Sequence, residues 1–275
     1  MKPPPFAYLR AETTEEALAA LAEHGGEARV LAGGQSLMAM LNMRLARPAM
    51  LVDIMRVPSF GALVAEAGAL VVGAGVRQAG LQTRPGLARE VPLLAAALPW
   101  VGHWQTRARG TVCGSIAHAD PSAELPLVLA VLGGEVRLRS RRRRRRVPAE
   151  TFFAGMMLTA CEDDEMIEQV AFPLARDGET YAFAEVGRRH GDFAIVGCAA
   201  AVSRKHMRLA VCGVDDRPVV RSFPALEPSA LDDALNEFAW DLPAREDVHA
   251  TGRYRRDLVR HLGRKVLMEA GSCHC

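Results

Sequence analysis

The sequence is poor in aromatic residues, which make up 5% of its 275 positions. A hydrophobic core must therefore be built mainly from Ala, Val, Leu, Ile and Met. No stretch of 18 or more apolar residues occurs, and the start, Met1-Lys2-Pro3-Pro4-Pro5, lacks the apolar segment of a secretory signal. These absences argue against a membrane-spanning helix, and we expect a cytoplasmic protein.

The six cysteines form no CxxC pair and are mostly far apart. This spacing argues against a disulfide framework and against an iron–sulfur cluster held by this chain. Cys273-His274-Cys275 offers too few ligands, at a frayed terminus, for us to expect a metal site. The sequence also lacks GxGxxG, HExxH and P-loop motifs and a Ser-His-Asp arrangement, so none of the corresponding enzyme classes is indicated.

A strong excess of charge of one sign is absent too, because the formal net charge is +2. We therefore expect neither nucleic acid nor an acidic membrane as the main partner. The local exception is a run of arginines over 139–146, interrupted once by Ser140. Its position between two short apolar segments predicts a solvated hairpin tip. A basic nucleic-acid patch is the alternative interpretation.

The first part of the chain, residues 1–56, is predicted to be a small α/β unit. A Thr cap and early acidic residues start a helix at about 13, and Gly25-Gly26 ends it. A strand over 29–32 then runs through Gly33-Gly34 into a helix over 36–45, and a second strand follows over 50–54.

Residues 57–175 are predicted to form a second α/β subdomain, and 176–275 a separate C-terminal domain. The middle part has strands over 69–76, 135–139, 145–147 and 165–172, helical pieces over 78–90 and 93–98, a loop over 106–121 and a buried helix over 125–132. The last part has an antiparallel meander over 181–187, 193–203 and 207–214, then helices over 230–238 and 251–270. The fold class is α+β.

Two segments rich in small residues carry the chemistry. In the first, a strand passes through two glycines into a helix, a geometry in which backbone N–H groups can hold a phosphate, although a plain tight turn explains it equally well. The second contains hydroxyl and carboxylate groups suited to the hydroxyls of a flat, sugar-bearing ligand, and an ordinary long loop is its alternative. The first comprises Arg29, Val30, Leu31, Ala32, Gly33, Gly34, Gln35, Ser36 and Leu37. The second includes Thr111, Cys113, Gly114, Ser115, Ala117, His118, Asp120 and Glu124.

These two segments resemble the two FAD loops in the medium subunits of molybdenum hydroxylases, the xanthine dehydrogenase and carbon monoxide dehydrogenase family. Further similar segments follow in the family's order: Arg44-Leu45-Ala46-Arg47-Pro48, Leu51-Val52-Asp53-Ile54, Arg189-His190-Gly191-Asp192-Phe193-Ala194 and Tyr254-Arg255-Arg256-Asp257-Leu258. The collinearity extends through almost the whole chain, which makes it stronger evidence than either loop alone.

The resemblance implies a PCMH/vanillyl-alcohol-oxidase-type FAD-binding fold of two α/β subdomains plus a C-terminal antiparallel sheet with helices. It implies that residues 29–37 bind the FAD pyrophosphate, that Thr111, Gly114 and Ser115 contact the phosphate and ribityl region, and that Glu124 binds the ribityl chain. Val101, Gly102 and the stretch near Ile167 would contact the flavin ring, and Phe193 would shield one of its faces.

The resemblance also implies partners. A large subunit with the molybdenum cofactor would hydroxylate a substrate, and a small subunit with two 2Fe–2S clusters would pass the electrons to FAD and on to an external acceptor. The assembly expected is a dimer of heterotrimers. The substrate is left open among carbon monoxide, an aldehyde, a purine and an N-heteroaromatic compound.

One position departs from the family, since Cys113 replaces the first of two glycines in the second loop. A positive φ there would strain the backbone by roughly 1 kcal/mol, whereas a small buried thiol is the simpler interpretation. His103, His118 and His190 lie near the expected cofactor and could tune it or serve as structural loop histidines. The alternatives for the whole chain are a self-contained flavin oxidoreductase and a flavin-less scaffold subunit.

Overall fold

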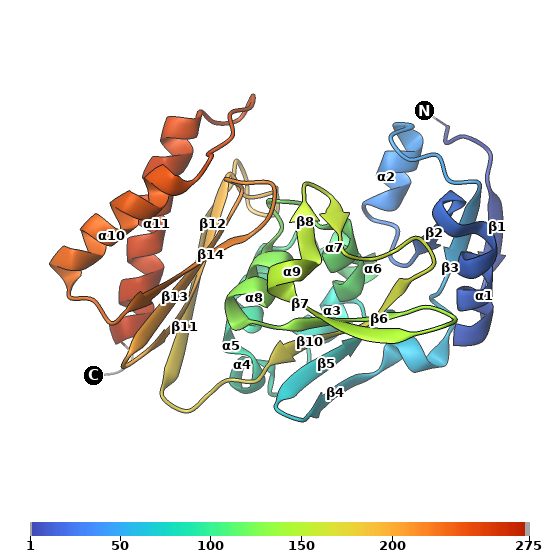
Figure 1. Ribbon diagram of the computed structural model, residues 1–275, viewed down its shortest axis with the longest axis horizontal. Helices are drawn as coiled ribbons and strands as arrows, with labels where there is room; N and C mark the ends of the chain where they lie inside the picture. Colours follow the sequence, from blue (N-terminus) through green and yellow to red (C-terminus); the bar gives the residue numbers. More distant parts are fainter. Residues whose placement is uncertain (1, 273–275) are drawn as a thin grey trace.

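The computed structural model describes residues 2–272, so the terminal Cys-His-Cys motif lies outside the described residues. Figure 1 shows a small N-terminal sheet at the right, a larger sheet in the middle and a C-terminal sheet with two long helices at the left. This mixture of parallel and antiparallel sheets with helices confirms the predicted α+β class. Among the described residues, no helix combines the length and apolar character needed to cross a membrane.

The N-terminal sheet is parallel, with β3 (Met50–Asp53) between β1 (Ala7–Arg10) and β2 (Ala28–Leu31). Helix α1 (Thr14–His24) begins at the predicted cap, where Thr13 Oγ1 accepts a hydrogen bond from the N–H of Glu16. The apolar face of α1 packs on the sheet, and η1 (Gly25–Glu27) and α2 (Leu37–Asn42) complete the unit. Strand β1 was not predicted from the sequence, because it is a short and largely exposed edge strand without a clear apolar alternation.

The middle part is built on a five-stranded antiparallel sheet. In chain order its elements are η2 (Pro58–Gly61), β4 (Leu63–Glu66), β5 (Ala69–Gly73), α3 (Gln78–Gln82), α4 (Leu87–Glu90), α5 (Pro92–Ala97), η3 (Leu98–Trp100), α6 (Trp104–Arg109), α7 (Val112–His118), α8 (Glu124–Leu132), β6 (Glu135–Arg139), β7 (Arg144–Pro148), α9 (Ala149–Phe152), β8 (Phe153–Gly155), β9 (Leu158–Thr159) and β10 (Met166–Pro173). The strand order is β4-β5-β10-β6-β7, and β8 and β9 form a separate small hairpin. Every residue of α8 is buried, as its apolar sequence predicted.

The C-terminal part is an antiparallel meander of β11 (Glu179–Val186), β12 (Val196–Ser203), β13 (His206–Cys212) and β14 (Val219–Pro224). Helices α10 (Pro228–Asp241) and α11 (Gly252–Ser272) cover one face, and α5 and α8 pack on the other. The core of the middle part therefore continues through α8 into the C-terminal sheet. Three of these strands were predicted from the sequence, and the edge strand β14 was not.

The predicted loop over 106–121 is wrong, because this stretch contains the end of α6 and all of α7. Thr111 Oγ1 caps α7 by accepting a hydrogen bond from the N–H of Gly114 at 3.0 Å, and Val112, Cys113 and Ile116 are buried. Tertiary burial and the cap outweigh the low helix propensity of the small residues. Two helix boundaries also differ: α2 ends at Asn42 rather than 45, and 78–90 is divided into α3 and α4.

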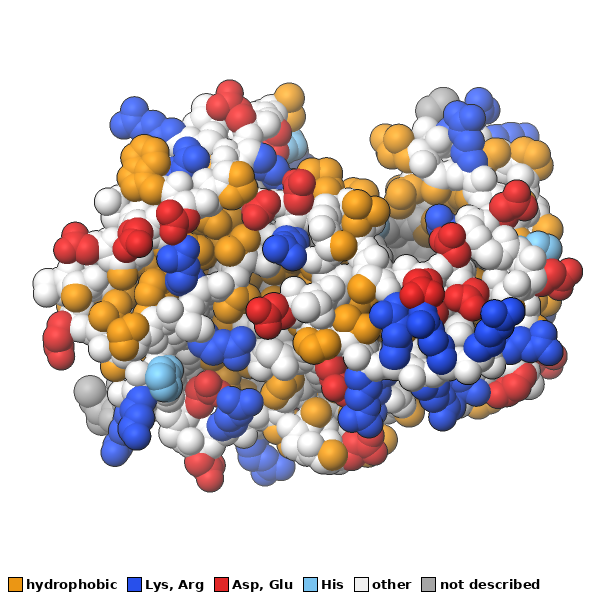
Figure 2. All heavy atoms as spheres, in the orientation of Figure 1, with side chains coloured by type: hydrophobic (Ala, Val, Ile, Leu, Met, Phe, Trp, Pro, Cys, Tyr) orange, Lys and Arg blue, Asp and Glu red, His pale blue; other side chains and the backbone are white. Residues whose placement is uncertain are grey.

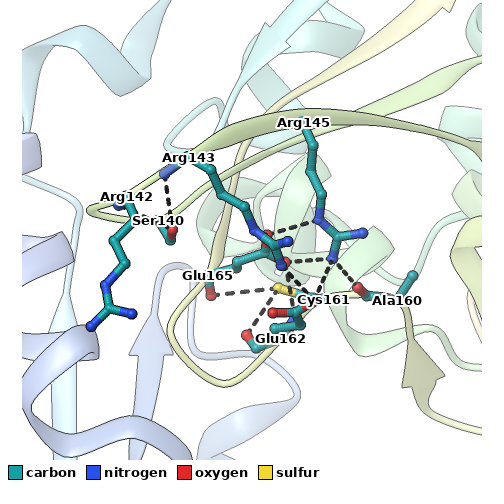
Figure 3. A network of polar contacts seen from close by, with 8 residues as sticks. All are labelled: Ser140, Arg142, Arg143, Arg145, Ala160, Cys161, Glu162 and Glu165. Atoms are coloured by element: carbon teal, nitrogen blue, oxygen red, sulfur yellow. Dashed lines mark hydrogen bonds and ion pairs between the residues drawn. The ribbon is translucent and has the colours of Figure 1, made fainter.

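The arginine run forms the predicted hairpin of β6 and β7, but its side chains are not all solvated. Arg143 and Arg145 both reach Glu165, whose side chain is 0% exposed (Figure 3). Two nitrogens of Arg145 lie 2.8 and 2.6 Å from the carboxylate oxygens of Glu165, and Glu162 pairs with Arg143. Burial alone would raise the pKa of Glu165, yet hydrogen bonds from Arg145 and the N–H of Glu162 lower it. The chain thus neutralises part of its own arginine run, which disfavours the nucleic-acid interpretation.

We expect Glu165→Gln to lower the free energy of unfolding by about 2 kcal/mol, since two guanidinium groups lose a buried anionic partner. Chemical denaturation followed by circular dichroism measures this loss. Glu162→Gln is the matched control, because the Glu162 side chain is 57% exposed and its loss should stay below about 1 kcal/mol. Equal losses in the two variants would contradict the role of Glu165 as the anchor of this hairpin.

Candidate functional site

The two small-residue segments predicted from the sequence lie against each other. A Cβ atom placed on Gly33 would lie 2.3 Å from the carbonyl oxygen of Arg109 and 2.6 Å from the Cα of Gly110. Only glycine allows this approach of backbone to backbone. Figure 2 shows the molecular surface hollowed between the N-terminal unit and the middle part. The turn between β2 and α2 is thereby held next to the residues that lead into α7.

The first segment offers backbone donors at its turn. Within residues 2–272, no acceptor bonds to the N–H groups of Gln35, Ser36 and Leu37. Gly34 has a φ of +71°, and the side-chain amide of Gln35 turns back to donate to the carbonyl of Gly33 at 3.2 Å. Successive free N–H groups after a glycine in this conformation form a concave site for anionic oxygens.

The other residues of the first segment belong to strand β2 or lead out of it, and do not form the turn. Arg29 donates from Nη1 to the carbonyls of Gly26 and Ala28, toward the start of β2. Val30 packs against the core of the N-terminal unit. Leu31 ends β2, and Ala32 leads from it into the turn. The structure therefore holds the turn at Gly33 against Arg109 and Gly110, whereas the side chains of Arg29 and Val30 contact the strand and the core of the N-terminal unit.

The second segment presents one side of α7. Gly114, Ser115 and His118 are partly exposed and Ala117 is exposed, whereas Thr111 is buried and occupied as the helix cap. An isolated bridge between Arg77 and Thr111 ties the start of α7 to the segment that precedes α3. The exposed side of α7 thus carries small side chains, while the N–H groups of Gly114 and Ser115 are bonded to Thr111.

Cys113 faces the opposite way, into the core. Its Sγ lies 3.4 Å from the carbonyl oxygen of Val72, and burial raises the pKa of the thiol to about 12. Cys113 is a helical residue and does not adopt a positive φ, so the strain considered from the sequence does not arise. The thiol contributes packing, and its protonated state excludes a nucleophilic role near neutral pH.

The segment containing Val101 and Gly102 is held by Arg107, which was not predicted from the sequence, and by Gly191, which was quoted there without this role. Arg107, only 9% exposed, donates hydrogen bonds to the carbonyls of both residues. Gly191 packs closely against the same segment, since a Cβ atom placed on it would lie 2.8 Å from the carbonyl oxygen of Gly102. The expected ring-contacting segment is therefore fixed by α6 and by the loop between β11 and β12. The role of Arg107 has no signal in the sequence, because a single arginine in a helix is normally solvated.

Three carboxyl groups lie near the second segment. Asp120 accepts a hydrogen bond from the N–H of Ser122 at 2.8 Å and so shapes the turn before α8. Glu124 is 4% exposed; burial raises its pKa to about 7, and the charge of Asp120 adds to the shift. Glu185 of β11, which the sequence analysis missed, is 9% exposed and has an unpartnered buried oxygen, Oε2. Burial raises the pKa of Glu185 to about 8, and the charge of Glu124 adds to this shift.

Because its pKa is raised, the buried carboxyl of Glu185 keeps its proton near neutral pH, which makes the stability of the fold depend on pH. The folded state holds this proton up to about pH 8, whereas the ordinary value is 4.5, so between these values the unfolded state binds fewer protons. The free energy of unfolding should therefore fall as pH rises, by up to about 1.4 kcal/mol per pH unit. Glu185→Gln removes the ionisable group, so the variant should gain stability relative to the unmodified chain between pH 6 and about pH 8. Parallel denaturation curves of both proteins across this range test it, and a constant difference would contradict it.

The remaining predicted residues are spread around the same region. Ile167 lies at a bulge of β10 with its side chain in the core that also contains Val101 and Val112. Phe193 is 59% exposed, on the loop whose Gly191 rests on Gly102. The expected FAD fits these residues by their chemistry, since the first segment offers free N–H groups, and the second offers small side chains and the buried carboxyl of Glu124. Among the described residues, no cluster of His, Cys, Asp and Glu is arranged to hold a metal ion.

Comparison with known proteins agrees with the geometry. Residues 4–175 match the family described as the FAD binding domain in molybdopterin dehydrogenase, and residues 181–270 match the carbon monoxide dehydrogenase flavoprotein C-terminal domain. The chain is 34% identical to the 6-hydroxypseudooxynicotine dehydrogenase complex subunit alpha of Paenarthrobacter nicotinovorans, covering 98% of this chain and 96% of the relative. It is 33% identical to the nicotine 6-hydroxylase medium subunit of the same organism, covering 99% of each chain.

Solved structures show the same fold. A chain of carbon monoxide dehydrogenase from Hydrogenophaga pseudoflava superposes with a TM-score of 0.93 at 29% identity over 100% of both chains. A chain of quinoline 2-oxidoreductase from Pseudomonas putida 86 superposes with a TM-score of 0.91 at 32% identity over 100% of this chain and 99% of the other. Both family domains match in order, and the relatives match over nearly their full length. This chain therefore belongs to the family of FAD-binding medium subunits of molybdenum hydroxylases.

Proposed function

We propose that this chain binds FAD in the hollow between residues 33–37 and 111–115 and carries electrons within a heteromeric molybdenum hydroxylase. The observation that supports this most directly is the contact of the Gly33 turn with Arg109 and Gly110, because it sets both expected FAD segments side by side. A dinucleotide needs such a pair of segments, one for its pyrophosphate and one for its sugar-like chain.

Each part of FAD has a proposed partner. The N–H groups of 35–37 hold the pyrophosphate, and the backbone at Gly114 and Ser115 contacts the phosphate and ribityl region. Glu124 binds a ribityl hydroxyl, for which its buried carboxyl is suited. Val101, Gly102 and Ile167 border the flavin ring, and Phe193 covers one face of it. Residues 1–175 form the proposed FAD-binding domain, with subdomains at about 1–56 and 57–175, and 176–275 form the C-terminal domain.

The proposed partners are a large subunit with the molybdenum cofactor and a small subunit with two 2Fe–2S clusters, assembled as a dimer of heterotrimers in the cytoplasm. Two relatives are named as parts of larger enzymes, one as a subunit of a dehydrogenase complex and one as a medium subunit. A flavin, when bound, accepts single electrons and releases a pair, so it links cluster chemistry to an external acceptor. The protein supplies the binding and the electrostatic setting.

Purification of the native complex through a tag on this chain tests the proposal. We expect flavin absorption overlaid with iron–sulfur bands, together with one small and one large co-purifying chain. Flavin bands on a lone chain would instead support a self-contained flavin oxidoreductase. Absence of flavin from a gently handled complex would contradict the electron-transfer role and support a scaffold subunit.

A further inference from the structure

Arg107 donates hydrogen bonds to several backbone carbonyl groups of the segment before α6. Its Nη1 lies 2.9 Å from the carbonyl oxygen of Val101 and 2.8 Å from that of Gly102, and a longer bond of 3.4 Å reaches Pro99. Its Nε donates to Gln82 Oε1 at 2.9 Å. Within residues 2–272, Arg107 takes part in no ion pair. Its buried charge is therefore compensated mainly by these backbone carbonyls and by Gln82.

This arrangement fixes the direction of two N–H groups. In a trans peptide the C=O and the N–H of the same plane point in opposite directions. Because the carbonyls of Val101 and Gly102 turn toward Arg107, the N–H groups of Gly102 and His103 turn away from it. No acceptor among the described residues bonds to either N–H group. The segment thus presents two adjacent backbone donors on the side opposite the guanidinium.

The loop between β11 and β12 supports the same segment. A Cβ atom on Gly191 would lie 2.6 Å from His103 Nδ1 and 2.8 Å from the Gly102 carbonyl oxygen. The rings of Trp100 and His190 lie 4.9 Å apart, centroid to centroid. With this loop packed against it, the backbone at Gly102, which has a φ of +54°, has little freedom to rotate.

We propose that Arg107 is a positioning residue that directs the N–H groups of Gly102 and His103 toward the acceptor atoms on the polar edge of the flavin ring. The inference rests on the proposed function, which places this segment beside the ring. A flavin ring carries carbonyl oxygens and ring nitrogens along that edge, and these gain electron density when the ring is reduced. Two fixed N–H donors, with a buried cation behind them, stabilise the reduced form more than the oxidised form. Arg107 thereby raises the reduction potential of the bound flavin without touching it.

Arg107→Lys tests the proposal, because an ammonium group keeps the charge but cannot hold two carbonyls and Gln82 in one planar arrangement. The complex purified through this chain is used to measure the flavin reduction potential and the visible spectrum. The full chain depleted of flavin is used to measure affinities for FAD and for ADP, which has the pyrophosphate but no flavin ring. We expect a negative shift of the potential, a dissociation constant for FAD raised about tenfold, and an unchanged affinity for ADP.

Arg89→Gln is the matched control, since Arg89 is an exposed arginine of α4, and all of these values should stay unchanged. An Arg107→Lys variant with unaltered potential and FAD affinity overturns the inference, and so does an equal loss of FAD and ADP binding, which would mark a general structural defect. Should Arg107→Lys not fold, Gln82→Met is the second variant, because it removes only the acceptor of Arg107 Nε. We expect it to shift the flavin reduction potential in the same negative direction. An unchanged potential in Gln82→Met would overturn the proposal. Absence of flavin from the unmodified complex would instead remove the proposed function itself.

Discussion

Gly33→Ala is expected to raise the dissociation constant of FAD by about 100-fold, which corresponds to about 2.7 kcal/mol. The added methyl carbon would lie 2.3 Å from the carbonyl oxygen of Arg109, and the atoms that it meets are backbone. Backbone cannot rotate away as a flexible side chain does, so the turn and the start of α7 must separate by up to about 1 Å. A ligand that spans both segments then loses its fit to one of them.

Equilibrium binding of FAD to the flavin-depleted full chain measures this effect. Gly80→Ala is the control, because a Cβ atom on Gly80 has no atom within 4 Å and the position lies in helix α3. This control should keep its FAD affinity and gain stability of up to about 1 kcal/mol. A Gly33→Ala variant that binds FAD within twofold of the unmodified chain would contradict the placement of the pyrophosphate at this turn.

The first of the two segments proposed to bind FAD could be recognised in the sequence because its signal is local. A strand, two glycines and a helix stand next to one another, and glycine has few reasons to occur at such a junction other than a turn or a close approach. The function of this turn could not be inferred from the turn alone. The second segment lies more than 70 residues away in the chain and meets Gly33 only in the folded protein. Collinear resemblance to a family, rather than local chemistry, supplied that link.

Residues that act through tertiary contacts had no such signal. Gly191 was quoted as part of a similar segment, but its packing on Gly102 depends on how the C-terminal sheet meets α5 and α8. Glu185 occupies one position in an otherwise ordinary strand, and its burial follows from the elements that cover that face of the sheet. Helix α7 was predicted as a loop for the same reason, since its small residues form a helix only where core packing and the Thr111 cap support them.

Arg255 also belonged to a similar segment without a stated role, and the structure supplies one. It is 1% exposed in α11 and donates to the carbonyls of Ile195 and Gly213 and to Asp247 Oδ2, at 2.5, 2.7 and 2.6 Å. One guanidinium thereby joins the last helix to the entry of β12, the exit of β13 and the loop before α11. Ile195, one of the residues that Arg255 contacts, directly follows the loop that carries Gly191 and Phe193. The C-terminal sheet should therefore depend on Arg255 for its stability.

We expect Arg255→Met to lower the free energy of unfolding by about 3–5 kcal/mol, because two buried carbonyls and a carboxylate lose their shared donor. Denaturant titration of the full chain, followed by circular dichroism, measures the loss. Arg253→Met is the matched control in the same helical turn, where the side chain is exposed and the change should stay within about 0.5 kcal/mol. Should Arg255→Met not accumulate in folded form, Asp247→Asn keeps the shape of the partner and should cost about 2 kcal/mol. If both variants unfold at the same denaturant concentration as the unmodified chain, the buried guanidinium does not hold the C-terminal sheet together.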